Sequence, residues 1–381
     1  MTAAIEGWRE ERLESLVRRA TEPGMINFGG GLPSDLQFPK RALAAAFVRV
    51  LATGDSSALQ YGWAEGQAGL RERIAARLNA RGAHVAAEDV IITNGAQQAI
   101  SIAVDLLLRP GDAVGVEDVS YPAALAMFRR RGLRLAPLGR GRACYVMPSL
   151  NNPAGAMMTE SQRRQLCARR IPIIEDDAYG DLVFSSPPGP PLLADVPART
   201  YHVGTFSKTL CPGLRVGWLI APVKQRRRAL HIKESADLQA NSLAQAVVAD
   251  FLAHDDFEAR VALLRRFYRA RAVRLATEVR RFLPSWRFEF PTGGFSLWLT
   301  TDAPADELAF LETALQAGVA FDVGSTFERA PQATTCAHLR LCYSFTAPST
   351  FARGVERLAK AWRRIARRTR VEKGPGERRA P

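Results

Sequence analysis

Short apolar runs alternate with amphipathic stretches through the middle of the chain, and this alternation predicts strands and helices in turn. The apolar runs are VIITN, AVGVED, ACYVMPSL, IPIIEDD, TYHVGTF and RVGWLIAP, between residues 90 and 222. Helical stretches separate them, such as AQQAISIAVDLLL after the first run and AALAMFRRRG after the second. Short buried strands separated by helices are typical of a mainly parallel sheet covered on both faces, so we expect an α/β fold.

The pattern changes after about residue 250. A long charged helix is predicted over residues 256–282, followed by a strand pair near RFEF and GGFSLWLT and by a helix over 305–317. VAFDVGSTF, LRLCYSF and a final helix from about 349 to 368 come next, which indicates a second, smaller α+β unit. We expect a large domain over residues 41–255, a small domain from 1–40 and 256–370, and a basic disordered tail over 371–381.

Two helices are predicted before the first apolar run. The first twenty residues place Trp8, Leu13, Leu16 and Val17 at helical spacing among charges. The second spans residues 66–81 and is closed by Gly82. Between them, MINFGGGLPSDLQFP is a Gly/Pro-rich crossing segment, whose glycines at 29–31 allow either close approach to a ligand or simply a tight turn.

Length and composition fit an intracellular globular protein. The chain has 381 residues, of which 47% are apolar, enough for one large or two moderate domains. It has no stretch that approaches a membrane span and no apolar signal core at its start, so we expect no membrane association. Its five cysteines, at 144, 167, 211, 336 and 342, lack CxxC spacing, which predicts neither disulfides nor a metal site and favours the cytoplasm.

The net charge of +14 raises the hypothesis of nucleic-acid binding. Much of this charge is arginine spread along helical segments such as 260–281, and part lies in residues 363–379. Since no zinc-finger spacing or aromatic RNA-binding signature accompanies it, we expect no specific nucleic-acid partner. A basic surface that favours anionic substrates is the simpler interpretation.

Polar residues follow the predicted strands at their carboxyl ends. They are Gly95 to Gln97, Tyr121, Asn151 and Asn152, Asp176 and Asp177, and Lys208. Ligands of parallel α/β sheets bind beyond these ends, so the sequence predicts one site there.

The stretch YHVGTFSKTLCPGLRVGW, residues 201–218, carries the most specific chemistry. A lysine at the end of a buried strand loses hydration, which lowers its pKa and makes Lys208 a nucleophile toward a carbonyl. The hydroxyls of Thr205 and Ser207 and the guanidinium of Arg215 suit a phosphate. Pyridoxal phosphate (PLP) requires such an amine beside a phosphate site. Taken alone, the same pattern is also typical of an ordinary surface lysine at a strand–loop corner.

Eight motifs in order span most of the chain: FGGGLPSD, YGWAEGQAGLRERIA, TNGAQQAI, VEDVSYP, NNPAG, EDDAYGDL, GTFSKTLCPGLRVGW and LRLCYSF. With them the chain resembles fold-type I PLP-dependent aminotransferases, especially the 2-aminoadipate aminotransferase branch and the aminotransferase-like domain of MocR regulators. The resemblance implies a large domain with a mainly parallel seven-stranded sheet and a smaller α+β domain.

The resemblance also implies roles for individual residues. Lys208 matches the lysine that forms the Schiff base and then moves the substrate's α-proton. Asp176, three residues before Tyr179, matches the carboxylate that pairs with the pyridinium nitrogen, although Asp177 is adjacent. Tyr179 and Asn152 match the donors to the cofactor's phenolic oxygen. Without the family, the acidic pair would read as a helix N-cap and Asn152 as part of a turn.

The remaining matches concern the cofactor's ring and phosphate, the substrate and a second subunit. Tyr121 matches the aromatic residue that stacks on the ring, and the phosphate cup matches Gly95, Ala96, Gln97, Thr205, Ser207 and Arg215. Arg340, with Asn152 and Gly30, matches the substrate site, where the arginine holds the α-carboxylate. Tyr61 matches a tyrosine that reaches the neighbouring subunit's phosphate, which implies a homodimer with shared active sites. Alone, Tyr121 would suggest plain packing and Arg340 a surface arginine.

Four departures from the family pattern stand out. Ala96 replaces a common serine or threonine, so one hydroxyl is lost from the phosphate cup. The segments from Tyr121 to Asn152 and from NNPAG to EDD are shorter than usual. Asp322 precedes Val323 and Gly324 where the family has Pro-Gly, near where substrate side chains tend to be read. A specialised biosynthetic enzyme would show such changes, and so would neutral drift.

The predicted function is transfer of an amino group from an amino acid to a 2-oxo acid by a ping-pong Schiff-base mechanism. Decarboxylation, elimination, replacement or oxidation of an amino acid would use the same fold and cofactor. A MocR-type sensing domain would need a winged-helix segment, whereas about twenty-five residues precede FGGGLP. A cofactor-free homologue is the remaining alternative, and the nearly complete set of PLP contacts argues against it.

Overall fold

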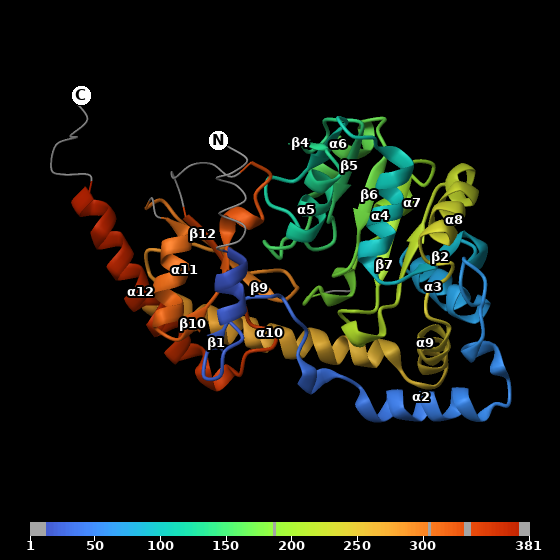
Figure 1. Ribbon diagram of the computed structural model, residues 1–381, viewed down its shortest axis with the longest axis horizontal. Coiled ribbons are helices and arrows are strands. Elements are labelled where there is room, and N and C mark those ends of the chain that lie inside the picture. Colours follow the sequence, from blue (N-terminus) through green and yellow to red (C-terminus); the bar gives the residue numbers. More distant parts are fainter. Residues whose placement is uncertain (1–12, 186–187, 304–305, 331–336, 373–381) are drawn as a thin grey trace.

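The computed structural model describes residues 13–185, 188–303, 306–330 and 337–372. Figure 1 shows a large sheet with its helices on one side of the molecule and a smaller group of strands and helices on the other. The long helix α10 (Phe257–Phe282) runs from one part to the other. In the described ranges, none of the helices is long and apolar enough to cross a membrane.

Seven strands form the large sheet in the order β2-β8-β7-β6-β5-β3-β4. Their bounds are β2 (Val90–Thr93), β3 (Ala113–Val116), β4 (Arg134–Pro137), β5 (Ala143–Val146), β6 (Ile173–Asp176), β7 (Thr200–Thr205) and β8 (Gly217–Ile220). Neighbouring strands pair in parallel except β8, which is antiparallel to both β2 and β7. The predicted α/β class with a mainly parallel seven-stranded sheet is therefore confirmed.

The edge strand β4 lacks the apolar run that marks the other six. Its four residues are exposed or half-buried, because an edge strand packs on fewer neighbours. Pro137 is tolerated there since its missing N–H removes no bond from the interior of the sheet. The hydrophobic pattern therefore predicts six of the strands but does not predict β4.

Helices pack against the sheet and position its loops. Their bounds are α2 (Lys40–Ala52), α3 (Ala68–Ala80), α4 (Ala96–Leu107), α5 (Pro122–Arg130), α6 (Glu160–Ala168), α7 (Leu192–Asp195), α8 (Val223–Asp237) and α9 (Ser242–His254). α4 contacts β6, β7 and β8, and α8 packs on α4 (Figure 1). Side-chain caps fix the starts of α9 and α10, where Asn241 accepts from the Ala244 N–H at 2.8 Å and Asp256 from the Ala259 N–H at 2.9 Å.

The smaller part is built on two short sheets. Its strands are β1 (Ile26–Asn27), β9 (Ser296–Thr301), β10 (Val319–Ala320), β11 (Asp322–Val323) and β12 (Ala337–Cys342), and its helices are α11 (Glu307–Gln316) and α12 (Phe351–Glu372). β11, β12 and β9 pair antiparallel, while β1 pairs in parallel with β10. The β1–β10 pair ties the N-terminal segment to this part. The rings of Trp286, Phe310 and Trp362 fill its core.

The predicted strand at RFEF is wrong. Arg287 makes an isolated bridge to Thr300, and residues 288–290 take no regular structure. The chain turns away because Thr292 instead pairs with Gly155 and Phe184 of the large part.

The predicted helix ends shift by a few residues. Residues 13–19 are helical, with Leu16 buried and Val17 54% exposed, while Trp8 lies outside the described residues. The C-terminal helix continues to Glu372, past the predicted start of the tail, and residues 373–381 lie outside the described residues.

Candidate active site

Lys208 lies in the turn after β7 and is half-buried. Its Nζ is 3.5 Å from the carbonyl oxygen of Gly31, to which it donates, and 5.2 Å from the ring centre of Tyr179. The ring of Phe295 is 5.7 Å away. Burial lowers the pKa of the Lys208 amine, because its charged form loses hydration there. The amine is thus disposed to act as a nucleophile nearer neutral pH than an exposed lysine.

Two adjacent carboxylates end β6, and their partners differ. Asp176 is buried, and its Oδ2 accepts from the Tyr145 hydroxyl at 2.6 Å. Burial raises the pKa of Asp176, and the Tyr145 hydrogen bond opposes that rise. Asp177 pairs with Arg81 at 2.5 Å. Burial works against its charge, but the neighbouring Arg81 outweighs it and lowers the Asp177 pKa.

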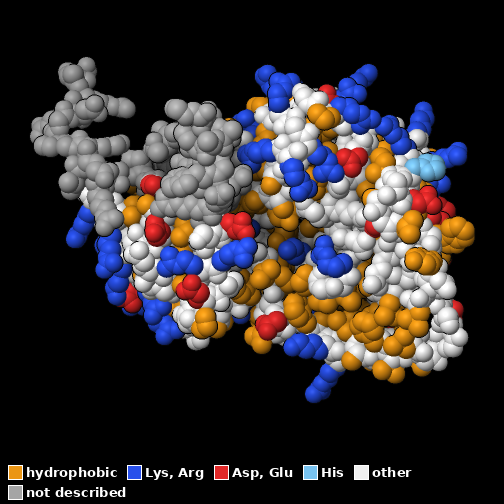
Figure 2. All heavy atoms as spheres, viewed as in Figure 1, with side chains coloured by type: hydrophobic (Ala, Val, Ile, Leu, Met, Phe, Trp, Pro, Cys, Tyr) orange, Lys and Arg blue, Asp and Glu red, His pale blue; other side chains and the backbone are white. Residues whose placement is uncertain are grey.

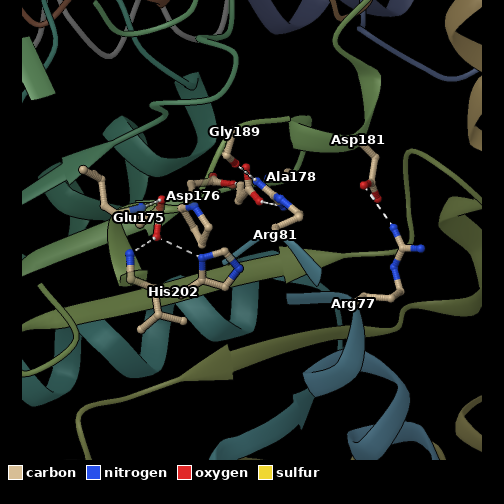
Figure 3. A network of polar contacts seen from close by, with 12 residues as sticks. Arg77, Arg81, Glu175, Asp176, Ala178, Asp181, Gly189 and His202 are labelled. Carbon is tan, nitrogen blue, oxygen red and sulfur yellow. Dashed lines mark hydrogen bonds and ion pairs between the residues drawn. The ribbon is translucent and has the colours of Figure 1, made fainter. Parts of the chain in front are cut away.

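The network behind these carboxylates is drawn in Figure 3. Glu175 accepts from the backbone N–H groups of Leu192 and Leu193 and bonds His202 Nδ1 at 3.0 Å. Arg81 reaches the Gly189 carbonyl as well as Asp177. Of the two candidates for the pyridinium partner, only Asp176 is without an arginine in the described structure, and its charge interacts with that of Lys208.

The predicted ring contacts lie around Lys208. Tyr179 is buried, and its ring meets Phe295 edge to face at 5.2 Å. Tyr121 stands at the N-cap position of α5, is half-buried and lies close enough to Lys208 for each group to influence the pKa of the other. Asn152 is buried and contacts Arg340. Burial raises the pKa of both tyrosines, so both hydroxyls stay protonated near neutral pH and can donate hydrogen bonds.

The predicted phosphate cup is a narrow cradle at the start of α4. Gly95 has φ +79°, and a Cβ there would lie 2.5 Å from Arg215 Nη2, so only glycine fits. Arg215 itself has a left-handed backbone, with φ 54°, and donates to the Asn94 carbonyl at 3.2 Å. The hydroxyls of Thr205 and Ser207 are 2.9 Å apart at the end of β7.

Ala96 and Gln97 begin α4 directly after Gly95, so their backbone N–H groups belong to the free N-terminus of that helix. Gln97 Oε1 is buried without a protein partner in the described residues. Hydroxyls, a guanidinium and a helix N-terminus together are the donor set that a phosphate needs. The cradle therefore fits the phosphate of the PLP that the resemblance implies.

A second layer holds this cradle. Asp237, at the end of α8, accepts from Asn94 Nδ2 at 2.6 Å, from Gln98 Nε2 at 2.7 Å and from Lys233 Nζ at 2.8 Å. The Lys233 side chain is fully buried. Sequence reasoning missed Asp237 because it is 143 residues from Asn94 and carries no motif.

At the substrate end, the arginine expected to hold the substrate's carboxylate is already paired with a carboxylate of the protein itself. Arg340, on β12, is buried and donates from Nη1 to Asn152 Oδ1 at 2.8 Å. Its Nε and Nη2 bind Asp322 Oδ2 at 2.9 and 2.7 Å. Gly30, also predicted at this site, donates its N–H to the same carboxylate at 3.0 Å.

Tyr61 lies away from this cluster. Its side chain is 79% exposed, and it lines a surface groove with Trp63 and residues of α2, α3 and α9. The structure thus brings the other predicted residues together, whereas Tyr61 lies apart from them on the surface.

Besides Asp237, three contributors to the site were not assigned these roles from the sequence. Tyr145 supports Asp176, Phe295 packs beside Lys208 and Tyr179, and Gly31 accepts from Lys208. The uniformly buried run of β5 gave no signal for Tyr145, whose contact with Asp176 depends on β5 lying beside β6 in the sheet. In the described residues, no group of three or more histidine, cysteine or acidic side chains is arranged to hold a metal ion.

The family model for class I and II aminotransferases matches residues 23–358. Among relatives, a 2-aminoadipate transaminase of Thermus thermophilus is 32% identical, over 92% of this chain and 93% of that one. The probable rhizopine catabolism regulatory protein MocR of Rhizobium meliloti is 29% identical, over 73% of this chain and 60% of the regulator.

A solved structure shares the fold. It is LysN, an α-aminoadipate aminotransferase of Thermus thermophilus complexed with N-(5'-phosphopyridoxyl)-L-leucine. It is 30% identical with a TM-score of 0.84, covering 92% of this chain and 94% of that one. Both branches named from the motifs are therefore found among the relatives.

Proposed function

The chain belongs to the class I and II aminotransferases and is a PLP-dependent enzyme of that family, and we propose that Lys208 is its catalytic nucleophile. The observation that carries this assignment is the Lys208 amine itself: half-buried, lowered in pKa, and situated between Tyr179 and Gly31. The reaction moves an amino group between an amino acid and a 2-oxo acid.

PLP, when bound, supplies an aldehyde that captures the substrate amine and a ring that withdraws electrons from the α-carbon. Lys208 Nζ then takes the α-proton and returns it, and its lowered pKa keeps it competent as a base. Asp176 holds a proton at the ring nitrogen, supported by the Tyr145 hydroxyl. Tyr179 and Asn152 would hold the phenolic oxygen of the cofactor by donating to it, and Tyr121 would hold its ring.

We assign the phosphate to Gly95, Ala96, Gln97, Thr205, Ser207 and Arg215. The tight Gly95–Arg215 approach and the paired hydroxyls support the assignment. The amino acid's carboxylate is assigned to Arg340 with Asn152 and Gly30, which the buried position of the guanidinium favours.

A homodimer with shared sites is proposed from the exposed apolar face. Tyr61, Trp63, Leu36 and Leu59 are each at least 67% exposed, more than a stable monomer usually leaves uncovered. Figure 2 shows hydrophobic side chains gathered at the lower right, where Figure 1 places α2. Covering this face with a second copy would bring Tyr61 to the partner's phosphate cup.

The division into a large domain over 41–255 and a small domain from 1–40 and 256–370 is also proposed. The β1–β10 pairing supports assigning the N-terminal segment to the small domain. A cytoplasmic location stays a prediction from the cysteine pattern.

The first test is an absorbance titration of the PLP-loaded enzyme with 2-aminoadipate, leucine and phenylalanine in the absence of any oxo acid. Stoichiometric conversion to pyridoxamine phosphate, reversed by 2-oxoglutarate or pyruvate, is expected. Continued turnover that needs no acceptor would contradict transamination and indicate elimination, replacement, decarboxylation or oxidation.

The second test traps the lysine. Borohydride reduction should fix PLP covalently to the wild type and to Lys360→Ala, which removes an exposed lysine of α12, but not to Lys208→Ala. A Lys208→Ala protein that retained reducible, covalently bound cofactor would refute the nucleophile assignment.

A further inference from the structure

The carboxylate of Asp322 already fills the place assigned to the substrate's carboxylate. Asp322 on β11 lies directly opposite Arg340 on β12, so the two side chains project from the same face. Its Oδ2 binds Arg340 Nε at 2.9 Å and Nη2 at 2.7 Å. Both of its oxygens are 3.0 Å from the Gly30 N–H.

Two of the three proposed substrate contacts are thus engaged by one side chain of the protein. The third, Asn152, occupies another side of the same guanidinium through its Oδ1. The fit is close, since a Cβ on Gly29 would lie 3.0 Å from Asp322 Oδ1. Asp322 thus holds the Nε–Nη2 edge of Arg340 and Asn152 binds its Nη1, so a carboxylate that takes the Nε–Nη2 edge must displace Asp322.

We propose that Asp322 is a specificity-determining residue that competes with the substrate's carboxylate for Arg340. The proposal rests on the proposed function, because it concerns the carboxylate end of that same site. A substrate carboxylate gains the Nε–Nη2 edge of Arg340 only as it displaces Asp322, and Asp322 already neutralises the guanidinium, so the net contribution of the substrate's carboxylate to binding is small. The site then discriminates weakly between an amino acid and the corresponding primary amine.

Burial makes this competition strong. The Arg340 guanidinium lies 4.6 Å from the Phe327 ring centre, and the residue is 7% exposed. An ion pair in such a place is screened far less than one at the surface. Removing the charge of Asp322 would leave a buried arginine that needs an anion, which a substrate carboxylate can supply.

The test measures carboxylate binding to the PLP-loaded enzyme by calorimetry. The probe is 3-phenylpropionate, which is phenylalanine without its amino group and so binds without reacting. Asp322→Asn should lower its Kd at least about tenfold, the low end for a hydrogen bond to a charged group. Asp302→Asn, which removes the aspartate of the exposed Arg287–Asp302 pair, is the matched control and should leave Kd unchanged.

Two further readouts separate competition from a purely structural role. In Asp322→Asn the KM for phenylalanine should fall while kcat stays within about twofold, and the preference for phenylalanine over 2-phenylethylamine should rise about tenfold. A variant that merely loosens the site would lose kcat and bind 3-phenylpropionate more weakly. Either that result or an unchanged Kd would overturn the proposal.

Folding is controlled with a second variant. Asp322→Val suits a strand position and serves if Asp322→Asn fails to retain cofactor or to unfold cooperatively. Binding of 3-phenylpropionate requires no turnover. Tighter binding without transamination would therefore uphold the role of Asp322 and refute the proposed function, whereas transamination with unchanged binding would do the reverse.

Discussion

Two arginines mark the two ends of the active site, and their surroundings are opposite. Arg215, at the phosphate end, is exposed and donates to the backbone carbonyls of Asn94 and Pro212, with no carboxylate partner in the described structure. Arg340, at the substrate end, is buried and already paired with Asp322. In the described structure Arg215 is thus kept free of internal anions, whereas the charge of Arg340 is neutralised by Asp322.

The difference matches what each end has to hold. A phosphate is doubly charged and stays bound through many turnovers, so an arginine that offers its whole charge serves it well. A substrate must leave after each half-reaction, and tight ground-state binding does not raise kcat. The Asp322 carboxylate on Arg340 weakens substrate binding and leaves cofactor binding unchanged.

The largest effect is expected for Arg340→Gln, which tests whether the substrate end and the cofactor end are independent. Arg340→Gln leaves the Asp322 carboxylate unpaired beside the place assigned to the substrate's carboxylate, and such a loss costs about 2–5 kcal/mol in comparable cases, so kcat/KM for amino acids should fall about a hundredfold or more. Cofactor affinity should stay unchanged. Steady-state kinetics and cofactor dissociation measure the two effects separately, and Arg287→Gln, from the surface pair with Asp302, is the control. An equal loss of cofactor would mean that the two ends are not independent.

Arg215→Ala should produce the converse result. Removing one charge-assisted contact predicts about a tenfold to hundredfold rise in the Kd of PLP. The KM for amino acids at saturating cofactor should change little. Equilibrium dialysis of apo protein against PLP gives the first value. Arg226→Ala, which removes an arginine of α8 that pairs with Asp89, should leave PLP binding as in the wild type. Unaltered cofactor affinity in Arg215→Ala would contradict the phosphate assignment.

The cofactor end could be predicted well from the sequence, and the reason is local. Thr205, Ser207, Lys208 and Arg215 lie within eleven residues that join two buried strands, so the motif fixes their relative positions. Gly95 reaches them because parallel strands deliver their carboxyl ends to one edge. Their proposed roles await the tests above.

The substrate end and the supporting contacts could not be predicted in the same way. Asp322 was recognised as a departure, but its pairing with Arg340 depends on the β11–β12 register. Tyr145 belongs to an ordinary apolar run, and its hydroxyl acquires meaning only where β5 meets β6. Such contacts join residues far apart in sequence, and periodicity carries no information about them.

Tyr145→Phe tests a smaller effect at the ring. The Tyr145 hydroxyl lowers the pKa of Asp176 against the effect of burial, so its removal should raise that pKa further. Activity needs the ionised carboxylate and is lost as pH falls through its pKa, so the acid limb of the kcat–pH profile should move to higher pH. We expect kcat to fall about fivefold, as for one hydrogen bond. Tyr201→Phe, on β7, is the control; an unshifted acid limb would exclude this support.

Glu117 is a carboxylate with no arginine partner in the described residues, and its predicted effect is on stability rather than on catalysis. It follows β3 and accepts from the Met147 N–H at 3.1 Å. Burial raises its pKa to about 7. Asp322 shows the contrasting case, in which a guanidinium compensates the charge. Glu117 is therefore protonated in the folded enzyme at pH values where the unfolded chain has already ionised it.

The sign of the effect follows from this difference. A raised pKa in the folded state means that stability is fully present below the unfolded value and is lost as pH rises through about 7. Relative to Glu117→Gln, which cannot ionise, the wild type should lose on the order of 2 kcal/mol of unfolding free energy between pH 5 and pH 8. Urea denaturation at the two pH values measures the difference, with exposed Glu160→Gln as control. A constant gap between wild type and Glu117→Gln would show that Glu117 is ionised throughout, and hence that this carboxylate keeps its charge without an arginine.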